Sequence, residues 1–207
     1  MTQFDSKTYT AFSQALAFCG NSLLDTMNHT GDAGLQPGFW EAFPTFGDAG
    51  VREAVDGMKA YAEGASSAGG DPATDASVEF TRLFVGPPKP ATAPWETYYR
   101  AAPGQEVKVG FGEATFQMQG LLREAGLQVN NENNQFADHM GIELLLASVY
   151  SKRAAEGDEE AAEKLHSFVA EHPGTWVGKF RAVVEETEPG RYFSHLLALA
   201  EALLALA

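Results

Sequence analysis

Apolar residues recur at steps of three and four positions along almost the whole chain, a spacing that places them on one side of a helix. Runs in which apolar and polar residues alternate, the pattern typical of strands, are nearly absent. A chain of 207 residues is long enough for one well-filled core. The pattern therefore predicts an all-α fold, a single globular domain over residues 1–207 with roughly ten helices.

Start signals divide the N-terminal part of the chain into three main helices. Ser6 is expected to cap a helix whose apolar face reaches Met27, and Asp48 to cap a helix that runs past Tyr61. Asp71, followed directly by proline, should cap a third, because proline is favoured at the first helical position. The positions expected to face inward are Tyr9, Phe12, Leu16, Cys19, Leu23, Met27, Val51, Val55, Met58, Tyr61, Val78, Phe80 and Leu83.

The segment "EGASSAGG", residues 63–70, separates the second and third of these helices. It is expected to be a flexible connection, and residues 64–70 are the candidate hinge of the domain. Domain swapping across such a hinge would give a dimer. A monomer and a domain-swapped dimer are therefore both compatible with the sequence.

The C-terminal half also has a helical pattern. A helix is expected after Gly112, and a long one from about Asn133 to Glu156. Asp158 should cap the next helix, and "HPG" at residues 172–174 should form the corner before a further one. The positions expected to face inward are Phe116, Leu121, Leu122, Leu165, Phe168, Val169, Trp176, Phe180 and Val184.

The formal net charge is −14. This charge argues against a nucleic-acid partner, because phosphate binding needs a basic patch and the sequence has none. It favours a cationic partner such as a basic peptide, although an acidic surface can serve solubility alone. The single cysteine, Cys19, lies among apolar residues, so it is expected to be a small buried side chain without a disulfide.

The first residues, "MTQFDSKTYT", lack the basic and apolar regions of a secretory signal. No apolar run approaches the roughly 18 residues that a transmembrane helix needs. A cytoplasmic protein without stable membrane insertion is therefore expected.

Four of the ten prolines fall between residues 87 and 94, within the stretch "LFVGPPKPATAPWETYY". Because proline fixes its own φ and biases the residue before it, the Pro-rich loop over residues 85–95 should be rigid and non-helical. Such a loop presents Trp95, Tyr98 and Tyr99 at low entropic cost, which suits a peptide-binding surface. The alternative is that the rings only pin the loop to the core, and the sequence allows Trp95 to face either a cleft or the core.

Three ionisable residues begin the apolar helix expected after Asn133. His139 and Glu143 are one helical turn apart, with Asp138 beside them near the positive end of the helix dipole. His139 is expected to hydrogen-bond Glu143, which would favour its charged form. The alternative is a satisfied polar contact between packed helices.

Signals for catalysis or a bound cofactor are weak. The pair of Glu-x-x-His motifs that forms a helical-bundle metal site is absent, as are His-Glu-x-x-His, a phosphate loop and a nucleophile elbow. We expect no cofactor and no enzyme activity. A metal-dependent hydrolase using Asp138, His139 and Glu143 is kept as an alternative.

Three segments in order, "EFTRLFVGPPKPATAPWETYY", "NNENNQFADHMGIELLLASVY" and "FVAEHPGTW", resemble the TorD/DmsD family of redox-enzyme maturation chaperones. Ala137 stands where that family commonly has proline. The family's motif positions are occupied by Phe80, Leu83, Phe84, Gly86, Pro87, Pro94, Thr97 and Tyr98 in the first segment and by Asp138, His139 and Glu143 in the second.

The resemblance implies a cytoplasmic all-helical chaperone with no cofactor of its own. Its partners would be the catalytic subunit of a molybdopterin-dependent oxidoreductase and the twin-arginine signal peptide of that subunit. A helical adaptor that docks without recognising the signal peptide is a further alternative. The residues expected to bind the peptide are Leu83, Trp95, Tyr98 and Tyr99 at the apolar end and Asp138, His139 and Glu143 at the polar end.

Overall fold

The structure is a computed structural model that describes residues 4–102, 104, 106–129 and 135–207. Within these ranges it contains eleven α-helices and no strand, so the predicted all-α fold is confirmed. The elements are α1 (Ser6–Ser22), α2 (Met27–Thr30), the 3₁₀ turn η1 (Ala33–Leu35), α3 (Pro37–Glu41), α4 (Ala49–Ala68), α5 (Pro72–Phe80), the π-helical turn η2 (Thr81–Val85), α6 (Glu96–Arg100), α7 (Glu113–Glu124), α8 (Met140–Ala155), α9 (Glu159–Glu171), α10 (Pro173–Thr187) and α11 (Tyr192–Leu204).

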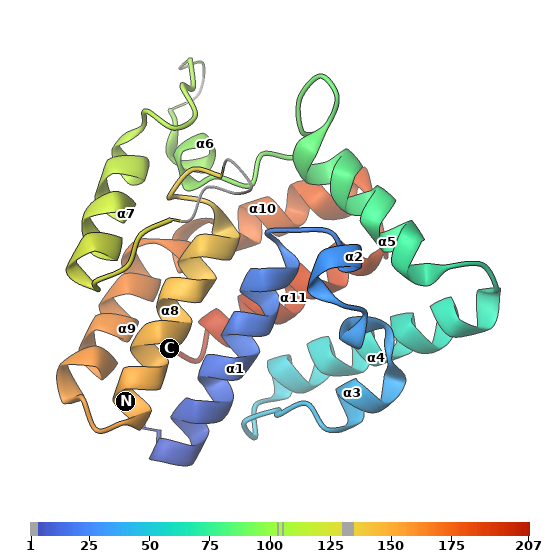
Figure 1. Ribbon diagram of the computed structural model, residues 1–207, viewed down its shortest axis with the longest axis horizontal. Helices are drawn as coiled ribbons and strands as arrows, with labels where there is room; N and C mark the ends of the chain where they lie inside the picture. The colour runs from blue at the N-terminus through green and yellow to red at the C-terminus, as the bar shows by residue number, and fades with distance from the viewer. Residues whose placement is uncertain (1–3, 103, 105, 130–134) are drawn as a thin grey trace.

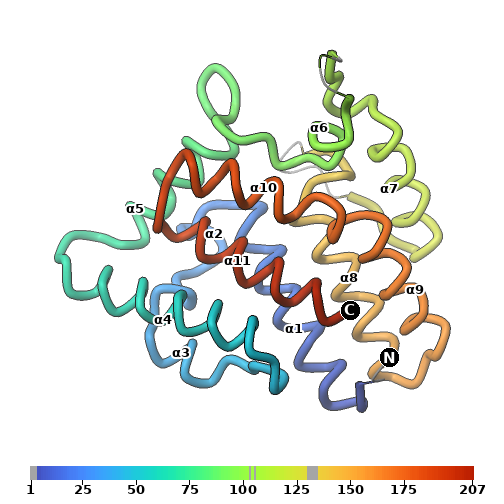
Figure 2. The backbone as a smooth tube through the Cα atoms, turned by 180° about the vertical axis from the view of Figure 1, so that it is seen from behind, coloured from blue at the N-terminus to red at the C-terminus, as the bar shows by residue number. Residues whose placement is uncertain are grey.

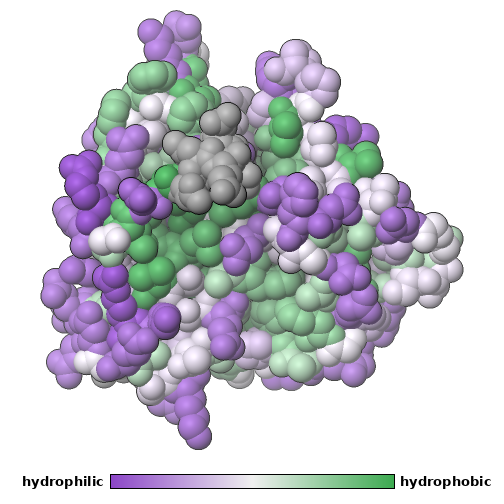
Figure 3. All heavy atoms as spheres, in the orientation of Figure 1, coloured by the Kyte–Doolittle hydropathy of each residue, from purple (hydrophilic) through white to green (hydrophobic). Residues whose placement is uncertain are grey.

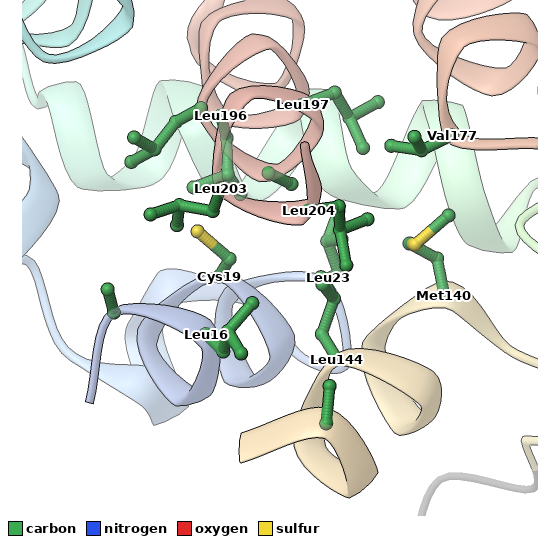
Figure 4. Packing of buried hydrophobic residues seen from close by; sticks show 14 of the residues in the cluster. Leu16, Cys19, Leu23, Met140, Leu144, Val177, Leu196, Leu197, Leu203 and Leu204 are labelled. Atoms are coloured by element: carbon green, nitrogen blue, oxygen red, sulfur yellow. The ribbon is translucent and has the colours of Figure 1, made fainter. Parts of the chain in front are cut away.

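Helix α11 lies at the centre of the bundle, where α1, α4 and α10 pack around it (Figures 1 and 2). α1 runs alongside α8, and α9 covers the other side of α8. Figure 4 shows leucines of α11 meeting Leu16 and Cys19 of α1, with Leu144 of α8 close by. These side chains are at most 4% exposed, and Cys19 is the buried apolar side chain that the sequence predicted.

α1 and α8 approach each other closely at two glycines. A Cβ atom added to Gly20 would lie 2.8 Å from the carbonyl oxygen of Gly141. A Cβ atom added to Gly141 would lie 2.7 Å from the carbonyl oxygen of Gly20. Distances this short are not found for real Cβ atoms, so the crossing requires glycine on both helices. The contact fixes the N-terminal end of α8 against α1.

The predicted caps of α4 and α5 are confirmed. Asp48 accepts a hydrogen bond from the backbone N–H of Val51, and Asp71 accepts from those of Ala73 and Thr74. The cap of α1 is Asp5 rather than Ser6, because the carboxylate of Asp5 accepts from the backbone N–H of Thr8 at 2.7 Å. α1 ends at Ser22, and Met27 belongs to α2.

The expected loop over residues 63–70 is mostly helical. α4 continues to Ala68, so only Gly69 and Gly70 connect it to α5. Both glycines have positive φ, which lets the chain turn between the two helices. The prediction of a long flexible connection is wrong for residues 63–68, and a hinge at the two glycines stays a prediction.

Two residues expected in the core lie on the surface. Val78 of α5 is 62% exposed and Phe116 of α7 is 57% exposed. The inner face of α7 instead carries Ala114, Met118 and Leu122. Among the described residues, no helix combines the length and the apolar character needed to cross a membrane.

Candidate functional site

The Pro-rich loop folds back on η2, the turn that precedes it. The backbone N–H of Thr92 donates to the carbonyl oxygen of Leu83 at 2.9 Å. Gly86 begins the loop with φ +96°, and a Cβ atom there would lie 2.5 Å from the backbone of Lys89. The predicted non-helical loop is confirmed, and its shape depends on a glycine that allows this close approach.

An antiparallel bridge joins the end of the Pro-rich loop to the residues that precede α8. The backbone N–H of Glu96 donates to the carbonyl of Asp138, and that of Met140 donates to the carbonyl of Pro94, each at 2.9 Å. Trp95 and His139 are the paired residues of the bridge. The two segments that the sequence singled out separately are therefore parts of one site.

Asp138 lies inside this site with 0% exposure, and both of its carboxylate oxygens are engaged. Oδ2 accepts from the backbone N–H of Thr97 at 3.1 Å and from its hydroxyl at 2.6 Å. Oδ1 accepts from the hydroxyl of Thr115 at 2.9 Å. The carboxylate thus holds α6 and α7 against the start of α8.

His139 is the N-cap of α8, which begins at Met140 and not near Asn133. Residues 133 and 134, where that helix was expected to begin, lie outside the described residues. The Nδ1 atom of His139 accepts from the backbone N–H of Gly141 at 3.0 Å, so the ring proton is on Nε2. Burial lowers the pKa of His139 to about 3. The predicted charged histidine paired with Glu143 is therefore wrong, because His139 precedes the helix, its Nε2 has no hydrogen-bond partner, and burial keeps the ring neutral.

Glu143 bonds to a different helix. Its Oε2 accepts from Trp176 Nε1 at 2.9 Å, and its carboxyl group also forms a hydrogen bond with the side chain of Glu96. Burial raises its pKa well above the usual value, and the nearby charge of Glu96 adds to this effect. A carboxyl group in such surroundings holds its proton more strongly than an exposed one.

Glu96 is a site residue that the sequence analysis missed. It has 0% exposure, and its Oε2 lies 2.9 Å from Nδ1 of His172. Its Oε1 lies 3.1 Å from Nη1 of Arg100, and the side chain also forms a hydrogen bond with that of Glu143. The one signal in the sequence was a carboxylate between Trp95 and Thr97, in a stretch otherwise read for its aromatic rings.

The corner expected at residues 172–174 is confirmed. His172 ends α9, and α10 begins at Pro173. Trp176 is 1% exposed, and the ring of Tyr99 stacks on it with centroids 5.2 Å apart. The corner therefore forms one wall of the same site as the Pro-rich loop.

The predicted peptide-binding residues differ in their access to solvent. Leu83, Asp138, His139 and Glu143 are at most 1% exposed, so they shape the site from inside in this conformation. Tyr98 is 50% exposed, and Trp95 and Tyr99 are half-buried. The ring of Trp95 packs beside Phe136, itself 38% exposed, and beside His139. Trp95 thus lies at the boundary between interior and surface.

Unpartnered polar atoms are concentrated at this site. Leaving aside the hydrogen bond between the side chains of Glu96 and Glu143, six of the seven buried side-chain nitrogen or oxygen atoms without a partner in the described part of the chain fall between residues 95 and 99 or between residues 135 and 143. Buried polar atoms in proteins are normally hydrogen-bonded, so such a concentration indicates a place where a ligand can supply partners. The six are Trp95 Nε1, Glu96 Oε1, Tyr99 Oη, Gln135 Oε1, His139 Nε2 and Glu143 Oε1.

The surface next to the site is partly apolar. Figure 3 shows hydrophobic residues gathered between α7 and α8 on the face seen in Figure 1. Phe111 before α7 and Phe116 within it are 74% and 57% exposed. Exposed rings beside a polar site are typical of a surface that binds another chain.

Comparison with known proteins agrees with this picture. The model of the nitrate reductase delta subunit family matches residues 47–182. The chaperone protein TorD of Shewanella pealeana is 28% identical over 126 residues, which cover 59% of this chain and 54% of the relative. The Tat proofreading chaperone DmsD of Salmonella paratyphi A is 30% identical over 124 residues, covering 60% of this chain and 56% of the relative.

The matched region thus spans little more than half the length of these curated relatives. The region matched by the family model, residues 47–182, includes the Pro-rich loop, the start of α8 and the corner before α10. Because the family model matches well over half of the chain, the protein belongs to the nitrate reductase delta subunit family, which includes the TorD and DmsD chaperones.

Proposed function

We propose that the protein is a cytoplasmic chaperone for the maturation of a molybdopterin-dependent oxidoreductase. It binds the catalytic subunit through the twin-arginine signal peptide and holds it until the cofactor is inserted and export can follow. Support comes from the relatives, which are named as a chaperone and as a Tat proofreading chaperone.

The observation that carries this proposal is the set of unpartnered polar atoms around the Trp95–His139 bridge. Nε1 of Trp95 and Nε2 of His139 are N–H donors that lack acceptors. A peptide in extended conformation has carbonyl oxygens along its backbone, and it would supply acceptors to such donors. The two segments that form the bridge are also the ones in which the resemblance to TorD and DmsD was found.

Charge and apolar surface fit the same ligand. A twin-arginine signal peptide has a pair of arginines followed by an apolar run. The chain has a formal net charge of −14, which favours encounter with the arginines. The exposed rings of Tyr98, Phe111 and Phe116 offer apolar area near the site. The half-exposed aromatic residues and Nε2 of His139 are thus proposed to contact the peptide, and the buried residues Leu83, Asp138 and Glu143 to hold the site in shape.

The geometry does not favour the hydrolase alternative. Both oxygens of Asp138 are occupied by threonine donors, and Nδ1 of His139 accepts from Gly141. Among the described residues, no three histidine, cysteine, aspartate or glutamate side chains are grouped as metal ligands. Asp138 bonds to α6 and α7, His139 to α8 and Glu143 to α10, so each side chain is engaged by a different part of the fold.

The proposal is tested by titrating the purified protein with fluorescent twin-arginine signal peptides and measuring anisotropy. Tyr98→Ala should weaken binding about tenfold, because interface aromatics often contribute a large share of affinity. Val78→Ala removes a similarly exposed apolar side chain on α5 and should leave binding unchanged. Absence of binding to any such peptide would contradict the proposal. Binding of a catalytic subunit that survives deletion of its signal peptide would favour the adaptor alternative.

A further inference from the structure

Two buried carboxyl groups meet between α6 and α8. Glu96 is the first residue of α6, and Glu143 lies in the first turn of α8. Both have 0% exposure, and their side chains are hydrogen-bonded to each other. A hydrogen bond between two carboxyl groups needs a proton on one of them, because an ionised carboxylate can only accept. The pair therefore holds one proton between the two helices.

The contacts of the two groups assign this proton to Glu143. Glu96 lies 2.9 Å from Nδ1 of His172 and 3.1 Å from Nη1 of Arg100, two nitrogen atoms that can donate to a carboxylate. Burial and the charge of Glu96 raise the pKa of Glu143 well above the usual value. Oε2 of Glu143 accepts from Nε1 of Trp176, so the proton given to Glu96 is on Oε1. Because the ionised Glu96 can only accept, Nδ1 of His172 carries a proton.

Removal of the shared proton would place like charges together. The carboxylate of Asp138, just before α8, already adds to the negative charge near Glu143. An ionised Glu143 would be a third carboxylate in a region from which water is largely excluded, where repulsion between like charges is poorly screened. The other groups that reach the pair are Arg100 and Tyr99 of α6, His172 at the corner before α10, and the uncharged Thr115 of α7 and Gly20 of α1.

The position of α6 depends on its attachments. α6 has five residues and carries the half-exposed ring of Tyr98, and a helix this short is not stable by itself. One attachment is the bond from the hydroxyl of Thr97 to the carboxylate of Asp138 at 2.6 Å, which involves no shared proton. The other is the bond between Glu143 and Glu96, which exists only while one of them is protonated.

We propose that Glu143 is a positioning residue of the peptide site, and that the proton it donates to Glu96 holds α6 in the position that binds the peptide. When this proton is lost, α6 moves away from α8 and Tyr98 leaves the binding surface. Affinity for the peptide therefore falls as pH rises. This inference rests on the proposed function for its ligand and adds a regulation of that site by pH. Glu143 acts through Glu96 and does not itself contact the peptide.

Hydrogen–deuterium exchange tests the attachment of α6 without a peptide. The exchange rates of the α6 amides are compared between the wild type and Glu143→Gln at each pH from 6 to 9, because their ratio cancels the intrinsic dependence of exchange on pH. Glutamine can donate to Glu96 and accept from Trp176, but it has no proton to lose in this range. The ratio of wild type to variant should rise with pH, by up to about tenfold per pH unit. A constant ratio would overturn the proposal.

Glu79→Gln is the matched control. Glu79 of α5 is 3% exposed, and burial raises its pKa as well. Its carboxylate accepts from the backbone N–H groups of Tyr192 and Phe193, far in sequence from α6, instead of from a second carboxyl group. This variant should show the same pH dependence of α6 exchange as the wild type. If both variants flattened that dependence, a general loosening of the fold with pH would explain it, and the proposal would be overturned.

Peptide binding gives the functional measurement. The dissociation constant of a twin-arginine signal peptide, measured by anisotropy, should increase for the wild type between pH 6 and 9, by up to about tenfold per pH unit. Glu143→Gln should show a weaker dependence, and equal pH profiles would overturn the proposal. Absence of peptide binding at every pH, together with α6 exchange that responds as expected, would reject the proposed function and retain the role of the proton.

Infrared spectroscopy covers the case in which Glu143→Gln fails to fold. A protonated carboxyl group has a C=O stretching band that is separate from the bands of a carboxylate. In Glu79→Gln, which removes the other buried glutamate with a raised pKa, this band should disappear over the pH range in which α6 exchange increases. Absence of the band at pH 6, or its persistence while α6 exchange increases, would overturn the proposal.

Discussion

Trp95 and His139 face each other across an antiparallel bridge, with their ring centroids 6.3 Å apart. Each ring has one N–H group that lacks an acceptor, Nε1 of Trp95 and Nε2 of His139. The bridge fixes these two donors relative to one another through the backbone, and the neighbouring carboxylate of Asp138 fixes the bridge relative to α6 and α7. The site is therefore held in place by its buried polar contacts before any ligand binds.

Thr97→Val should lower the free energy of unfolding by about 2 kcal/mol. The variant keeps the shape of the side chain but removes the hydroxyl that donates to Asp138 at 2.6 Å, so a buried carboxylate loses a donor. Thr92→Val is the control, since the hydroxyl of Thr92 donates to an uncharged carbonyl oxygen, that of Leu83, at 3.2 Å. Its loss should be about 1 kcal/mol or less. Urea denaturation measures the free energy of unfolding of both variants. Equal losses would show that the hydrogen bond from Thr97 to the carboxylate of Asp138 contributes no more than one to an uncharged oxygen.

Glu143→Gln should change how stability depends on pH. In the folded protein, burial and the charge of Glu96 raise the pKa of Glu143, whereas in the unfolded chain it is near the usual value of 4.5. Between these two values the folded state binds more protons than the unfolded state, so wild-type stability should fall as pH rises above about 4.5. The slope is at most about 1.4 kcal/mol per pH unit, and it ends at the raised pKa.

Glutamine does not ionise in this pH range, and its side-chain oxygen can still accept the hydrogen bond from the N–H of Trp176. The variant should therefore gain stability relative to the wild type as pH rises from 5 to 8, roughly the range over which an unfolded glutamate is charged. Urea denaturation at several pH values provides the comparison. If the stabilities of the two proteins changed in parallel with pH, the proton on Glu143 would not contribute to the pH dependence of stability.

Local signals in the sequence were sufficient for much of the fold. Asp48 and Asp71 were identified as caps because a cap depends only on the next few residues. Val78 and Phe116 were placed wrongly, since which side of a short helix is covered depends on neighbours that are distant in the sequence. The periodic pattern identifies an apolar stripe but not the helix that will cover it.

The site was predicted only in part, for a similar reason. The late start of α8 placed His139 before the helix, so the helical spacing between His139 and Glu143 did not apply. Glu96 bonds to His172 and Glu143 bonds to Trp176, and nothing in a single sequence relates these positions directly. The resemblance to a family brought the correct segments together, whereas the hydrogen bonds between them required the structure.

Gly20→Ala should lower the free energy of unfolding by about 1–3 kcal/mol. The new methyl group would lie 2.8 Å from the carbonyl oxygen of Gly141, and backbone atoms cannot move aside as the end of a flexible side chain can. Gly64→Ala is the matched control in α4, where an added Cβ atom meets nothing within 4 Å. That change should stabilise by about 0.5–1 kcal/mol, because alanine restricts the unfolded chain and favours helix. Opposite signs for the two variants in thermal and urea denaturation are the expected result. A neutral or stabilising Gly20→Ala would mean that α1 and α8 can separate without loss, and that their close crossing does not hold the start of α8 in place.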